Sequence, residues 1–256
     1  MNISETQTLL FYITLPVNFT YLRPKIIMDK PHVLYRDEYL VAIDKPVDLP
    51  VHRNSHMPHD APYLSKWAGQ HFDCSVYNVH RLDAKTSGVV VLAFTPEIAG
   101  KLTQQFERRM VKKTYFALVR AALANEGVFE KPVMNKKKGK LVPATTSFRT
   151  LETIQTDISY KEFTNIPLSL VELKPQTGRW HQLRQHLALE RNDIIGDNQH
   201  GDRTLNHIIE ERTGHKRLYL HATSLEVTHP ETGKGLLFNS TLPEAFNQVM
   251  AIYEGK

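Results

Sequence analysis

The sequence contains a single cysteine, Cys74, among its 256 residues. An intrachain disulfide is therefore impossible, and a zinc site built from several cysteines is excluded. A cysteine nucleophile is not favoured either, because no basic residue adjoins Cys74 in the sequence. This cysteine usage is typical of a protein of the reducing cytoplasm, and we expect that location.

Long apolar runs are also missing. The run at residues 9–15 is far shorter than the roughly 18 apolar residues that a membrane span needs, and Glu5 precedes it where a signal peptide carries positive charge. We therefore expect no membrane anchor and no signal peptide. The sequence shows no repeat, no low-complexity tract and no obvious interdomain linker, and 41% apolar residues suffice to bury a core.

Acidic residues are in the minority. The chain has 32 Lys and Arg against 27 Asp and Glu, which gives a formal charge of +5 before its 13 histidines are considered. A basic balance favours a polyanionic partner, because each cation beside a phosphate releases condensed counterions. Taken alone, this indicates no particular nucleic acid.

Hydrophobic periodicity predicts a mixture of strands and helices. Thr95 as N-cap and Pro96 at the first position predict a helix start, and apolar residues then recur at four-residue steps. Further helices are expected after Gly178 and from residue 243 to 253, and strands at residues 40–43, 89–93, 113–119 and 168–173. No regular βαβ rhythm is present, so we expect an α+β fold with a mixed, largely antiparallel sheet flanked by helices.

One carboxylate stands out by its position. Asp83 lies in a short polar turn directly before the apolar run at residues 89–93. Aspartate in such a turn either caps the backbone or projects a charged group for chemistry, and this segment alone does not decide between the two.

The run VHRLDAKTSG at residues 79–88 resembles the H-R-L-D-x-x-T-S-G signature of the RluA-type RNA pseudouridine synthases. Further matches follow in the order of that family, at residues 113–119, 175–186, 195–197 and 218–222. The resemblance implies a pseudouridine synthase fold, with a single catalytic domain over residues 28–256 and no cofactor. Residues 1–27 form an extension outside the resemblance, and Met28 as the natural start is a hypothesis.

The resemblance implies three catalytic residues. Asp83 would act on the ribose, as nucleophile or as base, and both routes require its ionised form. Arg179 would be the fixed cation beside it, unless Arg179 only begins a helix. Tyr115 would stack on the uracil and handle the proton at C5, whereas a tyrosine on an alternating strand is otherwise more often a core residue.

The expected RNA contacts are basic. In the family that this chain resembles, the residue at Arg81 fills the space of a base flipped out of the RNA; a salt bridge to Asp83 or phosphate is the alternative. His80, next to it, is also assigned to RNA binding. Lys136, Lys137 and Lys138 would contact phosphates if their segment, residues 131–147, is more than a solvated basic loop.

Metal-dependent chemistry is not expected. His181 and His186 are five residues apart on an expected helix, whereas a helical zinc pair needs a four-residue step and a third ligand. The motifs hold too few carboxylates for a metal-dependent nuclease. A uracil methyltransferase is disfavoured because no glycine-rich cofactor loop follows any expected strand.

Within the family, the chain looks closest to the tRNA pseudouridine-65 synthase (TruC) branch. The supporting residues are 196–202, GDNQHGD, where most relatives have tyrosine at the position of His200, together with the compact length and the absence of an N-terminal S4 domain. We therefore expect uridine 65 of tRNA as substrate, with ribosomal RNA as the alternative. A non-catalytic RNA-binding protein would have no reason to retain Asp83, Tyr115 and Arg179 together. Neither DNA nor a membrane is an expected partner, and a monomer is assumed.

Overall fold

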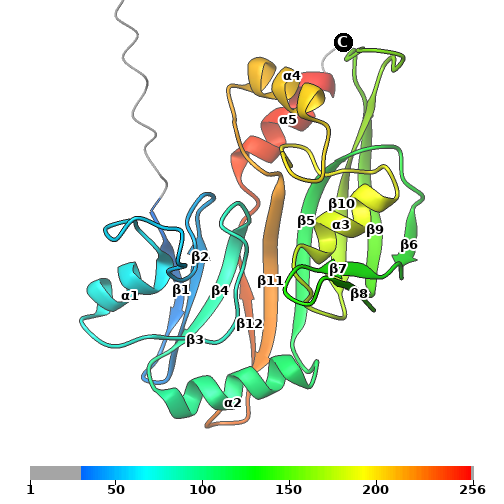
Figure 1. The fold of residues 1–256 in the computed structure, drawn as a ribbon. Coiled ribbons are helices and arrows are strands. Elements are labelled where there is room, and N and C mark those ends of the chain that lie inside the picture. Colours follow the sequence, from blue (N-terminus) through cyan, green and yellow to red (C-terminus); the bar gives the residue numbers. More distant parts are fainter. Residues whose placement is uncertain (1–29, 255–256) are drawn as a thin grey trace, which may run out of the picture.

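A ten-stranded sheet runs through the computed structural model, which describes residues 30–254 (Figure 1). The strand order is β1-β2-β4-β11-β5-β10-β9-β6, with β3 beside β4 and β12 beside β11. β4 and β11 pair in parallel, and the other ladders of the described residues are antiparallel. The predicted α+β class, with a mixed and largely antiparallel sheet in a single domain, is confirmed.

The elements have the following bounds. The strands are β1 (His32–Arg36), β2 (Leu40–Lys45), β3 (Tyr77–Asn78), β4 (Ser87–Ala93), β5 (Lys112–Arg120), β6 (Glu126–Phe129), β7 (Val133–Asn135), β8 (Lys140–Val142), β9 (Thr146–Gln155), β10 (Pro167–Pro175), β11 (Leu220–Thr228) and β12 (Gly235–Asn239). The helices are α1 (Leu64–Phe72), α2 (Pro96–Glu107), α3 (Gln182–Leu189), α4 (Arg203–Thr213) and α5 (Glu244–Glu254).

Most of the strands and helices expected from periodicity are present. The four predicted strands lie within β2, β4, β5 and β10, and the closing helix is α5. α2 begins where its cap predicts, because the Thr95 hydroxyl accepts a hydrogen bond from the Ile98 N–H at 3.2 Å. The basic segment expected as a loop instead contains the β7–β8 hairpin.

The parallel pairing of β4 and β11 depends on Gly88, which faces Ala222 across the ladder. Gly88 has φ +111°, and a Cβ atom there would lie 2.2 Å from the carbonyl oxygen of Ala222. Only glycine tolerates this approach. The turn that carries Asp83 is thereby fixed against the centre of the sheet.

The two faces of β4 pack against different helices. Val90 belongs to a buried cluster with Leu64 of α1, and Val91 belongs to a second cluster with Leu102 of α2. Each such buried side chain stabilises the fold by about 1.5–3 kcal/mol relative to its exposed state. These clusters hold the start of β4 rigidly.

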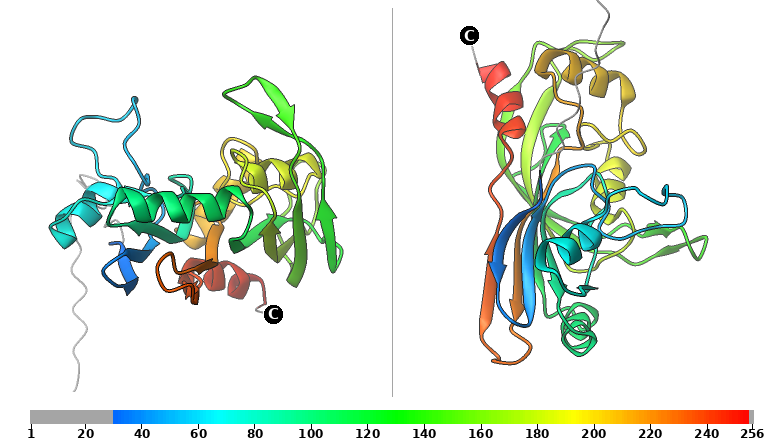
Figure 2. Two further views of the ribbon diagram at one scale, coloured as in Figure 1. Left: turned by 90° about the horizontal axis from the view of Figure 1, so that it is seen from below. Right: turned by 90° about the vertical axis from the view of Figure 1, so that its left-hand side faces the viewer.

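The other half of the sheet packs against α3, α4 and α5. Leu187, Ile209 and Phe246, one from each helix, lie in a single buried cluster with residues of β5 and β10. α3 and α5 lie on opposite sides of the sheet (Figure 2, left). Tyr115 of β5 contacts both this cluster and the cluster of α1, so it lies where the two halves meet.

The sequence also predicted that no membrane anchor is present and that residues 1–27 lie outside the catalytic domain. Within residues 30–254, none of the helices has the length and apolar character that crossing a membrane requires. The segment 1–27 and the hypothesis about Met28 fall outside the described residues.

Candidate active site

The turn before β4 presents the Asp83 side chain. The Asp83 carbonyl accepts a hydrogen bond from the Thr86 N–H at 3.0 Å, and the next carbonyl, of Ala84, accepts one from Lys45 Nζ at 3.1 Å. Lys45 is fully buried, and burial lowers the pKa of its ammonium to about 7. These contacts hold the backbone directly after the Asp83 side chain.

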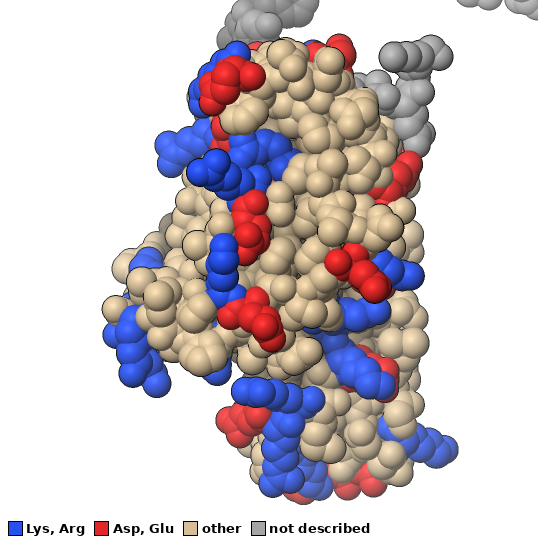
Figure 3. Space-filling model, turned by 90° about the vertical axis from the view of Figure 1, so that its right-hand side faces the viewer, with Lys and Arg blue, Asp and Glu red and all other residues tan. Residues whose placement is uncertain are grey.

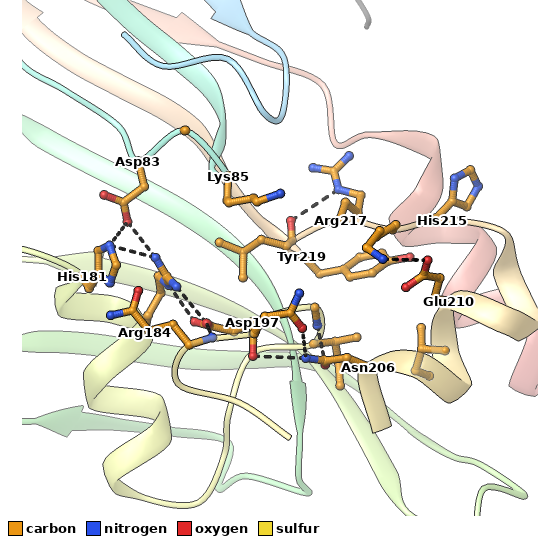
Figure 4. Close-up of a pocket in the computed structure, with 18 of the residues that line it drawn as sticks. Asp83, Lys85, His181, Arg184, Asp197, Asn206, Glu210, His215, Arg217 and Tyr219 are labelled. Carbon is orange, nitrogen blue, oxygen red and sulfur yellow. Dashed lines mark hydrogen bonds and ion pairs between the residues drawn. The ribbon is translucent and has the colours of Figure 1, made fainter. Parts of the chain in front are cut away.

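Asp83 lines a pocket of about 430 Å³, a size typical of a site for a small group (Figure 4). Its walls come from residues within segments 81–85, 180–184, 195–199, 206–210 and 215–219. The basic side chains of the lining outnumber the acidic ones, with Arg81, Lys85, Arg184, Lys216 and Arg217 against Asp83, Asp197 and Glu210. Such a pocket favours an anionic ligand.

Arg184 is the buried cation of the pocket. Its Nε and NH2 donate to the two carboxylate oxygens of Asp197 at 2.6 and 2.8 Å, and its NH1 lies 3.4 Å from Asp83 Oδ2. Burial alone would raise the pKa of the Asp197 carboxyl, but the hydrogen bonds from Arg184 hold it below its ordinary value. The bidentate pair with Asp197 leaves one edge of the guanidinium for Asp83.

Arg179 does not take the place predicted for it. Its side chain is exposed, and its Nε donates to the Pro143 carbonyl at 3.3 Å, away from Asp83. The reason is local: α3 begins only at Gln182, whose side-chain oxygen accepts from the Arg179 N–H at 3.0 Å. Arg179 therefore lies in the turn before the helix, and the predicted pairing with Asp83 is corrected to Arg184.

Tyr115 of β5 is half-buried between the two halves of the sheet. Burial, with a further contribution from the Asp83 charge, raises the pKa of the Tyr115 hydroxyl well above its ordinary value. The phenol is therefore protonated at neutral pH. Of the three residues predicted as catalytic, Asp83 lines the pocket, and Tyr115 packs against the buried cluster that contains Leu82, the residue before Asp83.

His80 is engaged in the fold. Its Nε2 accepts a hydrogen bond from the Val91 N–H at 3.0 Å, and its ring stacks on Phe106 at 4.6 Å between centroids. Burial, together with the charge of Lys113, lowers the pKa of His80 to about 3. These contacts fix the segment before Asp83 onto β4. They do not test whether His80 also contacts RNA, which stays a prediction.

The other predicted RNA contacts are exposed. Arg81 lies at the pocket with its NH1 3.5 Å from His52 Nε2. Lys136, Lys137 and Lys138 follow β7 in the β7–β8 hairpin, and Lys136 Nζ lies 5.7 Å from the ring centre of Trp180, which lines the pocket. Figure 3 shows Lys and Arg side chains on the lobe that projects at the left, where this hairpin lies. The hairpin thus extends the basic surface outward from the pocket.

The histidines considered as metal ligands have other partners. His186 is buried, with Nδ1 3.0 Å from the Thr146 hydroxyl and Nε2 2.9 Å from the Lys131 carbonyl oxygen. His181 Nε2 lies 3.4 Å from Asp83 Oδ2. No group of three or more potential metal-ligating side chains occurs within residues 30–254.

Sequence reasoning missed two residues of the site. Arg184 and Asp197 both fall inside segments that the motif comparison had matched, but neither was given a role. A signal was available, because an arginine on a buried helix face requires a carboxylate partner, and an aspartate follows the next glycine, Gly196.

Comparisons with known proteins agree with this geometry. A family model described as RNA pseudouridylate synthase matches residues 39–189. Proteins named tRNA pseudouridine synthase C from Salmonella typhi and Vibrio parahaemolyticus are 36% and 33% identical to this chain, covering 85% and 87% of it and 88% and 94% of their own lengths. The solved structure of human RNA pseudouridylate synthase domain containing 4 superposes with a TM-score of 0.66 at 28% identity, covering 87% of this chain and 93% of that one.

The mixed sheet, the pocket with Asp83 beside the buried Arg184, and these matches together identify the chain as an RNA-modifying isomerase. The chain belongs to the RNA pseudouridylate synthase family. The predicted family and the predicted enzyme class, RNA pseudouridine synthase, are confirmed.

Proposed function

We propose that this enzyme converts uridine 65 of tRNA to pseudouridine. The observation that carries the proposal is the Asp83 carboxylate in the pocket, with Arg184 NH1 3.4 Å away. Tyr115 packs against the buried cluster that contains Leu82, the residue before Asp83. The printed name of the relatives, tRNA pseudouridine synthase C, supports tRNA as the substrate class. The resemblance of residues 196–202 to the tRNA pseudouridine-65 synthase branch supports the position.

The reaction breaks the bond from C1′ of the ribose to N1 of uracil and forms a bond from C1′ to C5. A proton leaves C5, N1 gains one, and no electrons are exchanged with another molecule. Asp83 supplies an electron pair, by attack at C1′ or by removal of a proton from the sugar. Both routes need the carboxylate form of Asp83, and Arg184 is the buried cation beside it, with NH1 3.4 Å from Oδ2.

Tyr115 has two proposed roles. Its ring offers a surface on which the detached uracil stacks and is held while it turns. Its hydroxyl retains its proton at neutral pH, so it takes part at C5 by donating or relaying a proton and not as a phenolate base.

Access to the base requires contacts outside the pocket. Flipping a paired uridine costs a few kcal/mol. Arg81 is exposed at the pocket, and its proposed role is to fill the space that the base leaves. The exposed side chains of Lys136, Lys137 and Lys138 are proposed to contact phosphates.

The proposal is tested by mapping pseudouridine in total tRNA and ribosomal RNA from cells that lack this protein. We expect one tRNA position, 65, to lose pseudouridine and to regain it with the wild-type gene but not with Asp83→Asn. Asp60→Asn, which changes an exposed carboxylate on another loop, serves as the matched control and should restore the modification.

Other results of this mapping identify the alternatives. Loss at a ribosomal RNA position would replace the tRNA assignment. Rescue by Asp83→Asn would remove Asp83 from the chemistry and favour a non-catalytic RNA-binding role. An unchanged map would contradict the proposal as a whole.

A further inference from the structure

A chain of polar contacts leads from Asp83 to a second histidine. His181 Nε2 lies 3.4 Å from Asp83 Oδ2 and 2.9 Å from Arg184 NH1 (Figure 4). On the other side of the ring, His181 Nδ1 lies 2.9 Å from His200 Nε2. The roles proposed above for Asp83, Arg184 and Tyr115 make no use of either histidine.

These contacts determine where the imidazole protons lie. Arginine only donates hydrogen bonds, so His181 Nε2 at 2.9 Å from the Arg184 NH1 atom must offer its lone pair. The proton of the neutral His181 ring is then on Nδ1 and is donated to His200 Nε2.

Both rings are neutral under ordinary conditions. Burial lowers the pKa of His181 to about 4, with the Asp83 charge opposing and the Arg184 charge adding to this effect. Burial also lowers the pKa of His200. The charged and titratable groups that act on His181 are Asp83, Arg184, His200 and Asp197.

We propose that His200 is a positioning residue of the active site: it holds His181 in the Nδ1-protonated tautomer, so that His181 accepts from Arg184 and keeps that guanidinium beside Asp83. This inference rests on the proposed function only for its effect on rate. In the other tautomer, the Nε2–H of His181 would point at the Arg184 donor and compete with it for the Asp83 carboxylate. The tautomer of His181 therefore controls whether Arg184 stays beside the Asp83 carboxylate.

Further contacts fix the positions of His181 and His200. The His200 N–H donates to Asp197 Oδ1 at 3.0 Å, so one loop supplies the carboxylate for Arg184 and the imidazole for His181. Trp180 stacks on the His181 ring at 3.8 Å between centroids with 18° between the planes. His181 itself has φ +49°, a left-handed conformation that persists only where surrounding contacts impose it.

The test compares His200→Leu, which removes the acceptor, with His200→Gln, whose side-chain oxygen can accept from the Nδ1–H of His181. The tautomer is read directly from the ring nitrogen signals of 15N-histidine-labelled protein by NMR. His181→Gln assigns those signals by their loss. We expect the Nδ1–H form in the wild type and in His200→Gln, and a shift toward the Nε2–H form in His200→Leu.

Rate is measured in parallel under single-turnover conditions with the RNA that the mapping identifies. We expect His200→Leu to lose about tenfold to 100-fold in rate with unchanged RNA affinity and His200→Gln to stay within about threefold, as for other residues that orient a functional group. A wild-type Nε2–H tautomer, or a His200→Leu variant with wild-type tautomer and rate, would overturn the inference. Because the NMR signature needs no substrate, a failure of the proposed function would show separately, as wild-type protein without pseudouridine formation.

Discussion

Replacing Arg184 by lysine, beside the same change at Arg179, tests which cation serves Asp83. The two arginines are five residues apart in the sequence, yet one is buried against two carboxylates and the other is exposed. Lysine retains the positive charge but lacks the planar guanidinium group of arginine. The two variants therefore differ in which hydrogen bonds of the guanidinium are lost. We expect Arg184→Lys to be strongly impaired and Arg179→Lys to remain near wild type.

The magnitude follows from the distances. Opposite unit charges at the 3.4 Å between Arg184 NH1 and Asp83 Oδ2 attract by about 5 kcal/mol at an effective dielectric constant of about 20. In Arg184→Lys, the ammonium is attracted to Asp197 and would lie about 6 Å from Asp83. At that distance its attraction to Asp83 is weaker by roughly 2 kcal/mol. The lost hydrogen bond to a charged group adds about 1.5–3 kcal/mol. Together these predict a loss of about 400-fold to 5000-fold in the chemical step.

Stability provides the control for this comparison. Asp197 is buried, and a lysine cannot bond both of its oxygens, so we expect Arg184→Lys to cost about 1–2 kcal/mol. For a chain of this size that corresponds to a melting temperature lower by roughly 2–8 °C, well short of unfolding at assay temperature. Single-turnover rates, RNA affinity and melting temperature are measured for both variants. Wild-type turnover by Arg184→Lys, with a large loss in Arg179→Lys, would refute the assignment of Arg184.

Three further variants probe the rest of the site. Tyr115→Phe keeps the stacking ring and deletes the hydroxyl, so turnover should fall about 100-fold with RNA affinity retained; unchanged turnover would leave only stacking. Arg81→Ala should lose more activity on folded tRNA than on a short single strand, and equal losses would argue against its filling the place of the flipped base. Gly196→Ala should lower the free energy of unfolding by at least about 2 kcal/mol, seen as a lower urea midpoint. The reason is that Gly196 has φ +79° and a Cβ atom there would lie 1.7 Å from the Arg217 carbonyl oxygen. A wild-type midpoint would contradict this.

The strands and helices with strong periodicity could be predicted from the sequence. β4 is apolar after its first two residues, and α2 carries its own cap, so local chemistry sufficed for both. β9 was not predicted, because exposed polar residues interrupt its pattern. α4 was also missed, since its sequence is rich in charged and amide side chains and only part of one face is buried.

The cation of the site could not be predicted for a different reason. The motif contains two arginines, Arg179 and Arg184, and their roles depend on where α3 begins. His181 takes a left-handed φ of +49° and delays the helix until Gln182, which turns Arg179 away and places Arg184 on the buried side. Nothing in the residue types at 179–181 specifies this backbone conformation, because histidine adopts it only when contacts such as those to Asp83 and His200 enforce it.

The position of the pocket follows from one feature of the topology, the parallel pairing of β4 and β11. Parallel strands begin at the same edge of a sheet, so the turn before β4 and the loop before β11 lie side by side. Segments 81–85 and 215–219 therefore form neighbouring walls of the pocket, although more than 100 residues separate them in the sequence. Antiparallel pairing would have placed these segments at opposite edges and left Asp83 without its opposing wall. The close contact of Gly88 with Ala222, which permits the parallel pair, is thus the structural condition for the site.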